Sequence, residues 1–141
     1  TFDRAAGRHR DNLEAILELT DTAETPPATD EPLHASLSEF DDPIDRAAAL
    51  VGRSMVDERV LKQVVGFFVN EADREAADRF RAVRSSMDTS RDEAVELLAT
   101  LCGSEDDWAR AVHTAERTVQ RAYDHYADML EGMGVNPKPV C

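Results

Sequence analysis

The stretch from Glu105 to Glu131 constrains the fold most, because its pattern is that of one uninterrupted amphipathic helix. Ser104 and Asp107 at its start have the spacing of a capping box, in which each side chain binds the other residue's backbone N–H. On a helical projection the apolar residues fall within about 120° of arc, close to a heptad stripe. They are Trp108, Ala111, Val112, Ala115, Val119, Ala122, Tyr123, Tyr126, Met129 and Leu130. At about 1.5 Å per residue this helix spans roughly 40 Å.

Two earlier segments are also expected to be helical. Residues 2–20 place apolar side chains at helical spacing, with charged residues between them. Asp41 or Asp42 can cap a second helix that has Pro43 at its first position. We expect this helix to weaken at residues 52–54, because glycine costs about 1 kcal/mol relative to alanine inside a helix.

The segment from Met55 to Met87 allows two interpretations. Residues 64–69 alone have the β-branched and aromatic content of a buried strand. Charged residues interleaved before them, and small apolar residues recurring after them, keep a helical period and favour a helix. The pattern changes near Asn70, which predicts either a bend or the edge of a packing partner there. Residues 60–69 are expected to be buried nearly all round.

Ser90 and Glu93 repeat the capping-box spacing and predict that another helix starts at this point. Together the patterns predict an all-α fold, a four- to five-helix bundle with a long C-terminal amphipathic helix. Residues 1–141 are expected to form a single domain. Within it, residues 21–32, which are acidic and contain three prolines, predict a linker, and residues 135–141 predict a flexible tail.

The acidity of the chain is concentrated in one segment. The formal net charge is −13, and residues 21–45 hold eight acids and no Lys or Arg. Fourteen of the 16 basic residues are Arg, a composition that would suit a salt-adapted protein. Nucleic-acid binding is disfavoured, because no cluster of positive charge free of interleaved acids is available to neutralise phosphates.

A cytoplasmic setting without membrane contact is expected. No apolar run approaches the roughly 18 residues that span a bilayer, and no signal-peptide pattern begins the chain. Cys102 and Cys141 have neither the number nor the spacing of a disulfide framework or a zinc motif. The chain opens on Thr1, which fits both a processed start and a fragment of a longer protein.

His113 and Glu116 are the nearest approach to a metal-ligand pair, because residues three apart share a helix face. That face is the polar one, opposite the apolar stripe, so we expect both side chains to point to solvent. Cys102 lies on an apolar helix side, where burial raises a thiol's pKa and lowers its reactivity. The sequence therefore predicts no catalytic residue, no bound metal and no cofactor, and it favours a protein that is not an enzyme.

Interaction through helices is the favoured function. Aromatic and methionine side chains are enriched at protein interfaces. The predicted interface consists of Trp108, Val112, Val119, Tyr123, Tyr126, Met129, Phe67 and Phe68. The expected partner is a second copy of the chain, as in a homodimer, or another helical protein. Two alternatives stay open: a metal-binding bundle or enzyme with a site assembled across an interface, and an accessory module of a transcription regulator.

Overall fold

The structure, a computed structural model, describes residues 2–19 and 39–134 of the chain. Within these residues it has no strand, and its helices are α1 (Phe2–Leu17), α3 (Pro43–Asn70), α4 (Arg74–Leu101) and α5 (Glu105–Gly132). The predictions of an all-α fold and of a long C-terminal helix are confirmed. The predicted linker 21–32 and tail 135–141 lie outside the described residues.

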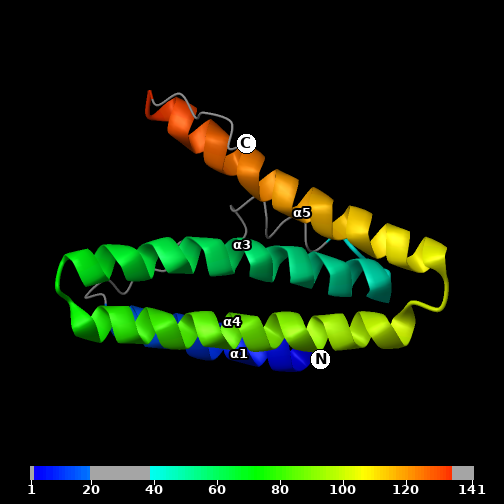
Figure 1. The fold of residues 1–141 in the computed structure, drawn as a ribbon, viewed down its shortest axis with the longest axis horizontal. Coiled ribbons are helices and arrows are strands. Elements are labelled where there is room, and N and C mark those ends of the chain that lie inside the picture. Colours follow the sequence, from blue (N-terminus) through cyan, green and yellow to red (C-terminus); the bar gives the residue numbers. More distant parts are fainter. Residues whose placement is uncertain (1, 20–38, 135–141) are drawn as a thin grey trace.

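Helices α3 and α4 form an antiparallel hairpin that is the main body of the fold (Figure 1). The chain reverses between them in three residues, where Ala72 adopts a left-handed φ of 59°. Asp73 then caps α4 by accepting a hydrogen bond from the backbone N–H of Ala76 at 3.0 Å. The predicted change near Asn70 was in the right place, but the prediction of a bend within one helix is wrong. Residues 64–69 lie in α3, so the helical interpretation of this segment is confirmed.

Helix α3 runs without interruption through Gly52, so the predicted weakening at residues 52–54 is wrong. The start of the helix is as expected, because Asp42 caps it through the backbone N–H of Ile44 at 2.9 Å. Helix α5 crosses α3 at Gly52 at close range. A Cβ atom added there would lie 2.7 Å from the carbonyl oxygen of Ala115. Packing against α5 offsets the low helix propensity of this glycine.

The separate helix predicted to start at Ser90 is also wrong, because α4 continues through this residue. Ser90 is fully buried, and its hydroxyl donates a hydrogen bond to the carbonyl of Ser86. The same hydroxyl accepts a bond from Nε of Arg8 at 2.8 Å, and Arg8 also forms an ion pair with Glu93 at 2.8 Å. The spacing that resembled a cap therefore serves to bind α1.

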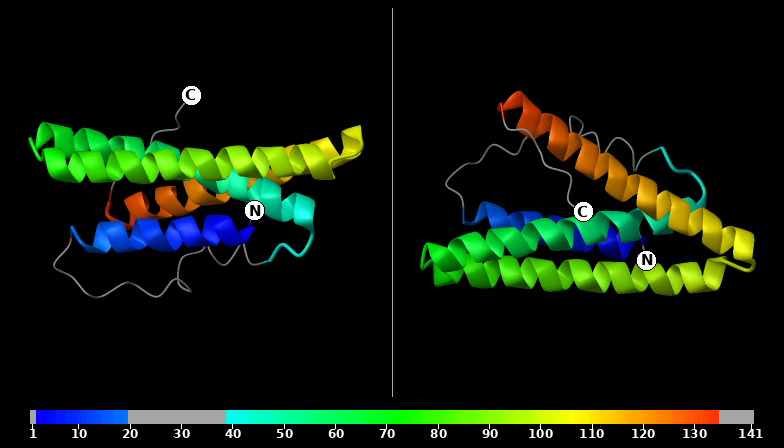
Figure 2. Two further views of the ribbon diagram at one scale, coloured as in Figure 1. Left: turned by 90° about the horizontal axis from the view of Figure 1, so that it is seen from below. Right: turned by 45° about the horizontal axis from the view of Figure 1, so that its top comes forward.

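Helix α1 lies alongside α4 and runs antiparallel to it (Figure 2). Several polar contacts hold it there. Besides the Arg8 interactions, Asn12 donates to Ser86 at 3.2 Å, and Glu18, just after the helix, forms an ion pair with Arg79 at 2.7 Å. Apolar contacts add to them: Ala5 is buried, and Phe2 packs against the core cluster, with the guanidinium carbon of Arg46 4.6 Å from the centre of its ring.

Buried side chains run along the α3–α4 hairpin, among them Val65, Ala77 and Met87, and one core cluster lies where α3, α4 and α5 meet. This cluster consists of Ala47, Ala48, Leu98 and Ala111. Towards the hairpin turn the cover thins. Of residues 60–69 only Val65 is buried, and Phe67 is 58% exposed, so the expectation of burial nearly all round is wrong. One face of residues 60–69 packs against α4, and the other faces of the second half of α3 are exposed.

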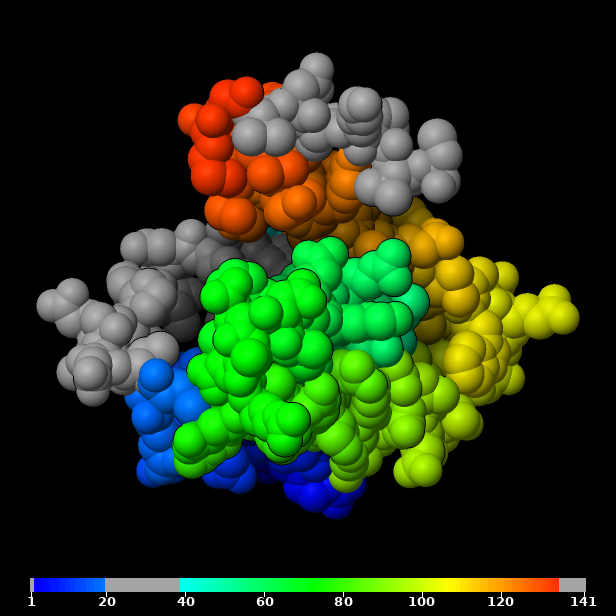
Figure 3. All heavy atoms as spheres, turned by 60° about the vertical axis from the view of Figure 1, so that its left-hand side comes forward, coloured from blue at the N-terminus to red at the C-terminus, as the bar shows by residue number. Residues whose placement is uncertain are grey.

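Helix α5 crosses α3 obliquely, packs on it along its N-terminal half and then departs from it (Figure 1). Viewed from the hairpin turn, the C-terminal end of α5 stands above α3 and α4 (Figure 3). A large part of the surface of this helix is therefore not covered by the helices described here.

Candidate interaction surface

The start of α5 is fixed by the capping box that the sequence predicted. The backbone N–H of Asp107 donates to the Ser104 hydroxyl at 3.2 Å, and the backbone N–H of Ser104 donates to the Asp107 carboxylate at 2.9 Å. The backbone N–H of Gly103 adds a third bond to the same carboxylate at 3.0 Å. The Ser104 hydroxyl also donates to this carboxylate, at 2.8 Å, and this bond, followed by that from Gly103, lowers the pKa of Asp107 by stabilising its charged form. The direction in which α5 leaves α4 is set by these local contacts.

Next to this corner, Cys102 is a free, half-buried thiol that packs against the core cluster. Burial raises its pKa, and the nearby charge of Asp107 raises it further. The predicted direction of this shift is confirmed. A thiol held protonated in this way is a weak nucleophile.

The face of α5 that packs on α3 is made of small residues, some of them polar. Ala111, Thr114 and Thr118 are the buried residues of the helix. The Thr118 hydroxyl donates to the Thr114 carbonyl at 2.9 Å, so its polarity is satisfied within the helix. This buried face lies about 80° round the helix from the centre of the apolar stripe, at 100° per residue. The sequence left open whether the stripe packs inside the chain or forms an interface, and the face that α3 covers lies beside the stripe.

Polar contacts hold the N-terminal half of α5 against the start of α3. The carboxylate of Asp45 accepts hydrogen bonds from the Thr114 hydroxyl at 2.9 Å and from Nε of Arg110 at 3.1 Å. Arg110 also forms an ion pair with Asp42 at 3.3 Å. Burial alone would raise the pKa of Asp45, but the hydrogen bonds from Arg110 and Thr114 outweigh it and hold the pKa below its ordinary value.

The uncovered apolar residues of α5 follow an unbroken alternation of four- and three-residue steps, which is the heptad repeat of a coiled coil. We call this row of eight residues the α5 seam. It consists of Trp108, Val112, Ala115, Val119, Ala122, Tyr126 and Met129 of α5, and of Met133, the residue that caps the C-terminal end of the helix. The two alanines are half-buried and the other six are exposed, Val112 by 54% and Tyr126 by 52%. The seam lies along the edge of the α3 contact, where a further helix could reach it.

The other predicted interface residues lie beside the seam or away from it. Tyr123 flanks it on the side remote from α3. Phe67 and Phe68 lie on α3, and Phe68 stacks on Phe80 of α4 with ring centroids 5.4 Å apart. The sequence reasoning missed Met133, because it ended the helix at Glu131. The signal that could have revealed Met133 is its position four residues after Met129, which continues the spacing of the stripe.

His113 and Glu116 are both exposed, as the sequence predicted, and they point away from α3. Among residues 2–19 and 39–134, no group of three or more His, Cys, Asp or Glu side chains is arranged to hold a metal ion.

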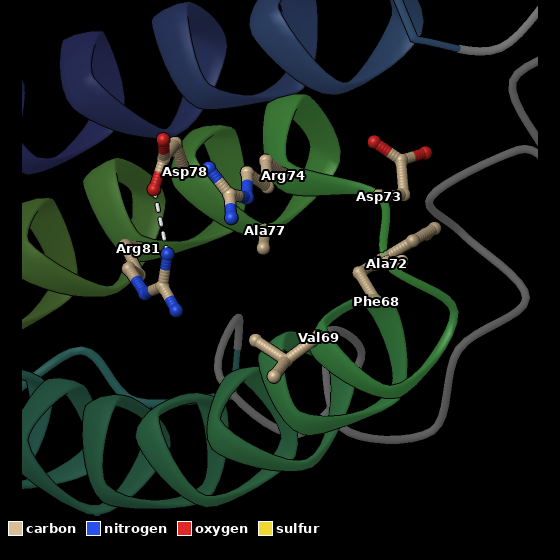
Figure 4. A pocket seen from close by; sticks show the side chains of 8 residues that line it. All are labelled: Phe68, Val69, Ala72, Asp73, Arg74, Ala77, Asp78 and Arg81. Atoms are coloured by element: carbon tan, nitrogen blue, oxygen red, sulfur yellow. Dashed lines mark hydrogen bonds and ion pairs between the residues drawn. The ribbon is translucent and has the colours of Figure 1, made fainter.

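A shallow pocket of about 390 Å³ lies at the hairpin turn (Figure 4). Phe68 and Val69 from α3 and Ala77 from α4 supply its apolar lining. Its charged groups are already engaged in part, because Arg81 pairs with Asp78 at 2.6 Å. The residues that line it include no pairing of a nucleophile with a base.

The comparisons with known proteins add no family. No family model, no curated protein and no solved structure matches this chain. None of the helices in the described ranges has the length and apolar content needed to cross a bilayer. The uncovered surface of α5 is therefore the feature from which a function can be inferred.

Proposed function

We propose that this protein is a non-catalytic interaction subunit that associates with itself, with the α5 seam of one copy packed against the α5 seam of another. One observation carries the proposal: every position of a heptad row more than three repeats long is apolar, and six of its eight residues are exposed in the single chain.

An exposed row of this kind is unusual for a protein that acts alone. Isolated apolar side chains are normal on a surface, whereas large contiguous apolar patches are typical of interaction sites. The seam is about 38 Å long at 1.5 Å per residue, and its Trp108, Tyr126 and two methionines are residue types enriched at interfaces. Covering it would bury these side chains, and association is the available way to do so.

The residues that flank the seam support a second copy as the partner. In a coiled coil the positions beside the seam select the partner by charge. Here they are Ala109, Ala111, Glu116, Thr118, Tyr123, His125, Leu130 and Gly132. Glu116 is the one residue among them that carries a formal charge. Two copies can therefore approach without rows of like charges facing each other along the seam. Two-fold symmetric dimers are also the commonest protein assemblies. The proposal includes a cytoplasmic setting, which suits the free thiol of Cys102.

The test compares two variants that add the same charge to exposed positions of α5. Val112→Glu places a carboxylate in the seam, and Gln120→Glu places one on an exposed position outside it. Light scattering over a concentration series gives the dissociation constant of each variant. We expect Val112→Glu to weaken self-association by about a hundredfold or more, because an unpaired charge would be buried. Gln120→Glu should stay within about threefold of the native protein.

Equal effects of the two variants on association would contradict the proposal. Circular dichroism of both variants confirms that each remains folded. Val112 is more than half exposed in the single chain, so its replacement leaves the intramolecular packing largely intact.

A further inference from the structure

We infer that the two α5 helices run antiparallel, with Ala115 of one copy in the same layer as Tyr126 of the other. This inference rests on the proposed self-association and goes beyond it, because it specifies orientation and register.

The sizes of the seam residues fit the antiparallel arrangement. With the two-fold axis between residues 120 and 121, each seam residue faces a seam residue of the second copy. The layers join Trp108 with Met133, Val112 with Met129, Ala115 with Tyr126, and Val119 with Ala122. A parallel dimer would instead place each residue opposite itself. Tyr126 would then meet Tyr126 while Ala115 met Ala115, so the layers would differ widely in size and close packing would be lost.

One pair of charges along α5 favours the same orientation. In the antiparallel register Arg117 lies level with Asp124 of the second copy. A parallel dimer would bring each of these groups level with its own kind. The side chains lie outside the seam, so they favour the orientation through their field rather than by direct contact.

The position of α3 is compatible with this arrangement. It flanks the N-terminal half of α5 and leaves the C-terminal half free (Figure 1). An antiparallel pair brings the flanked half of each α5 to the free half of the other, so the two α3–α5 contacts lie at opposite ends of the pair. A parallel pair would place both contacts at the same end.

Disulfide trapping tests the register. In a background where Cys102 and Cys141 are replaced by alanine, Ala115→Cys and Tyr126→Cys proteins are prepared separately and mixed before oxidation. The antiparallel register brings the two introduced thiols into one layer, and we expect a covalent dimer in the mixture. Each variant alone should give none, because identical positions lie 11 residues apart along the axis, about 16 Å. A disulfide needs Cα atoms within about 7 Å.

Cross-linking of the Ala115→Cys variant with itself would establish a parallel pair and overturn the inference. A dimer in solution that forms neither cross-link would also overturn it, while the proposed self-association would stand. If the chain does not associate at all, both proposals fail.

An exchange of sizes gives an independent check. Tyr126→Ala and Ala115→Tyr should each weaken association about tenfold or more, the first by leaving a gap and the second by overfilling a layer. A double variant with both substitutions again has one tyrosine and one alanine in each of these layers. Its dissociation constant should therefore return to within about threefold of the native value. A double variant weaker than both single variants would contradict the register.

Discussion

Two glycines of α3 form a matched pair for testing the close crossing of α5, because one lies at the crossing and the other lies in open space. At Gly52 an added Cβ would lie 2.7 Å from the Ala115 carbonyl oxygen and 3.0 Å from the Thr118 Cβ. At Gly66, one turn before the end of the same helix, an added Cβ would meet nothing within 4 Å. The perturbation is replacement of each glycine by alanine, singly.

Both substitutions gain the same helix propensity, about 0.8–1 kcal/mol in an interior position. At Gly66 this gain is unopposed, so we expect Gly66→Ala to raise the free energy of unfolding by about 0.5–1 kcal/mol. At Gly52 the methyl group meets backbone, which cannot rotate away, and α5 has to move outward. Overpacking of this kind costs about 1–3 kcal/mol, so Gly52→Ala should lower the free energy of unfolding by up to about 2 kcal/mol.

Urea unfolding followed by circular dichroism, at one protein concentration, measures both variants. The quantity of interest is the difference between them, about 1–3 kcal/mol, because the propensity term cancels. If Gly52→Ala stabilised the protein as much as Gly66→Ala, the close contact between α3 and α5 would be refuted.

Three further predictions concern α1, α5 and the start of α3. Asp45→Asn should lower the free energy of unfolding by about 1 kcal/mol at neutral pH. Because the pKa of Asp45 is lower in the folded protein, this contribution is present above the unfolded pKa of about 3.9 and disappears as the pH falls through the folded pKa. Unfolding curves of both proteins across this pH range measure it. A difference in the free energy of unfolding that grew as the pH fell would contradict the prediction. Arg8→Ala should speed amide hydrogen exchange in α1 about two- to fivefold by removing the bonds to Ser90 and Glu93, whereas the same change at the exposed Arg10 should leave exchange unaltered. Trp108 is the one tryptophan of the chain and is 42% exposed, so its burial on association should shift its fluorescence to shorter wavelength as the protein concentration rises. An emission maximum equal to that of the Val112→Glu variant at every concentration would argue against burial of the seam.

Features determined by neighbours in sequence could be predicted. The α5 capping box joins Ser104 and Asp107, and the start of α3 joins Asp42 and Pro43. Each involves residues within one helical turn, so the pattern contains the whole interaction. The length of α5 was predictable for the same reason, since its periodicity continues without a break.

Features determined by distant residues could not be predicted. Gly52 looked like a weak point because nothing near it in sequence reveals the backbone of Ala115 against it. Ser90 looked like a cap because its partner, Arg8, is 82 positions away. The hairpin turn was missed for a different reason: Ala72 occupies a left-handed conformation usually taken by glycine or asparagine, so the usual turn signal was lacking.

The candidate site was found in part. Most of the seam follows from periodicity alone, yet the sequence could not show which side of α5 meets α3. The hydroxyl of Thr114 is satisfied by Asp45 and that of Thr118 by the helix backbone, which allows these two polar residues to be buried. Small side chains permit the close approach, and that leaves the large ones exposed.

The mass of the native chain in solution tests the central claim most directly. Sedimentation equilibrium should be run both in dilute buffer and in about 1 M salt, where a Debye length near 3 Å screens the repulsion between two copies of charge −13. We predict a concentration-dependent approach to twice the 15.6 kDa of one chain. A mass that stays at 15.6 kDa at every concentration, in both salt conditions, would contradict self-association through α5.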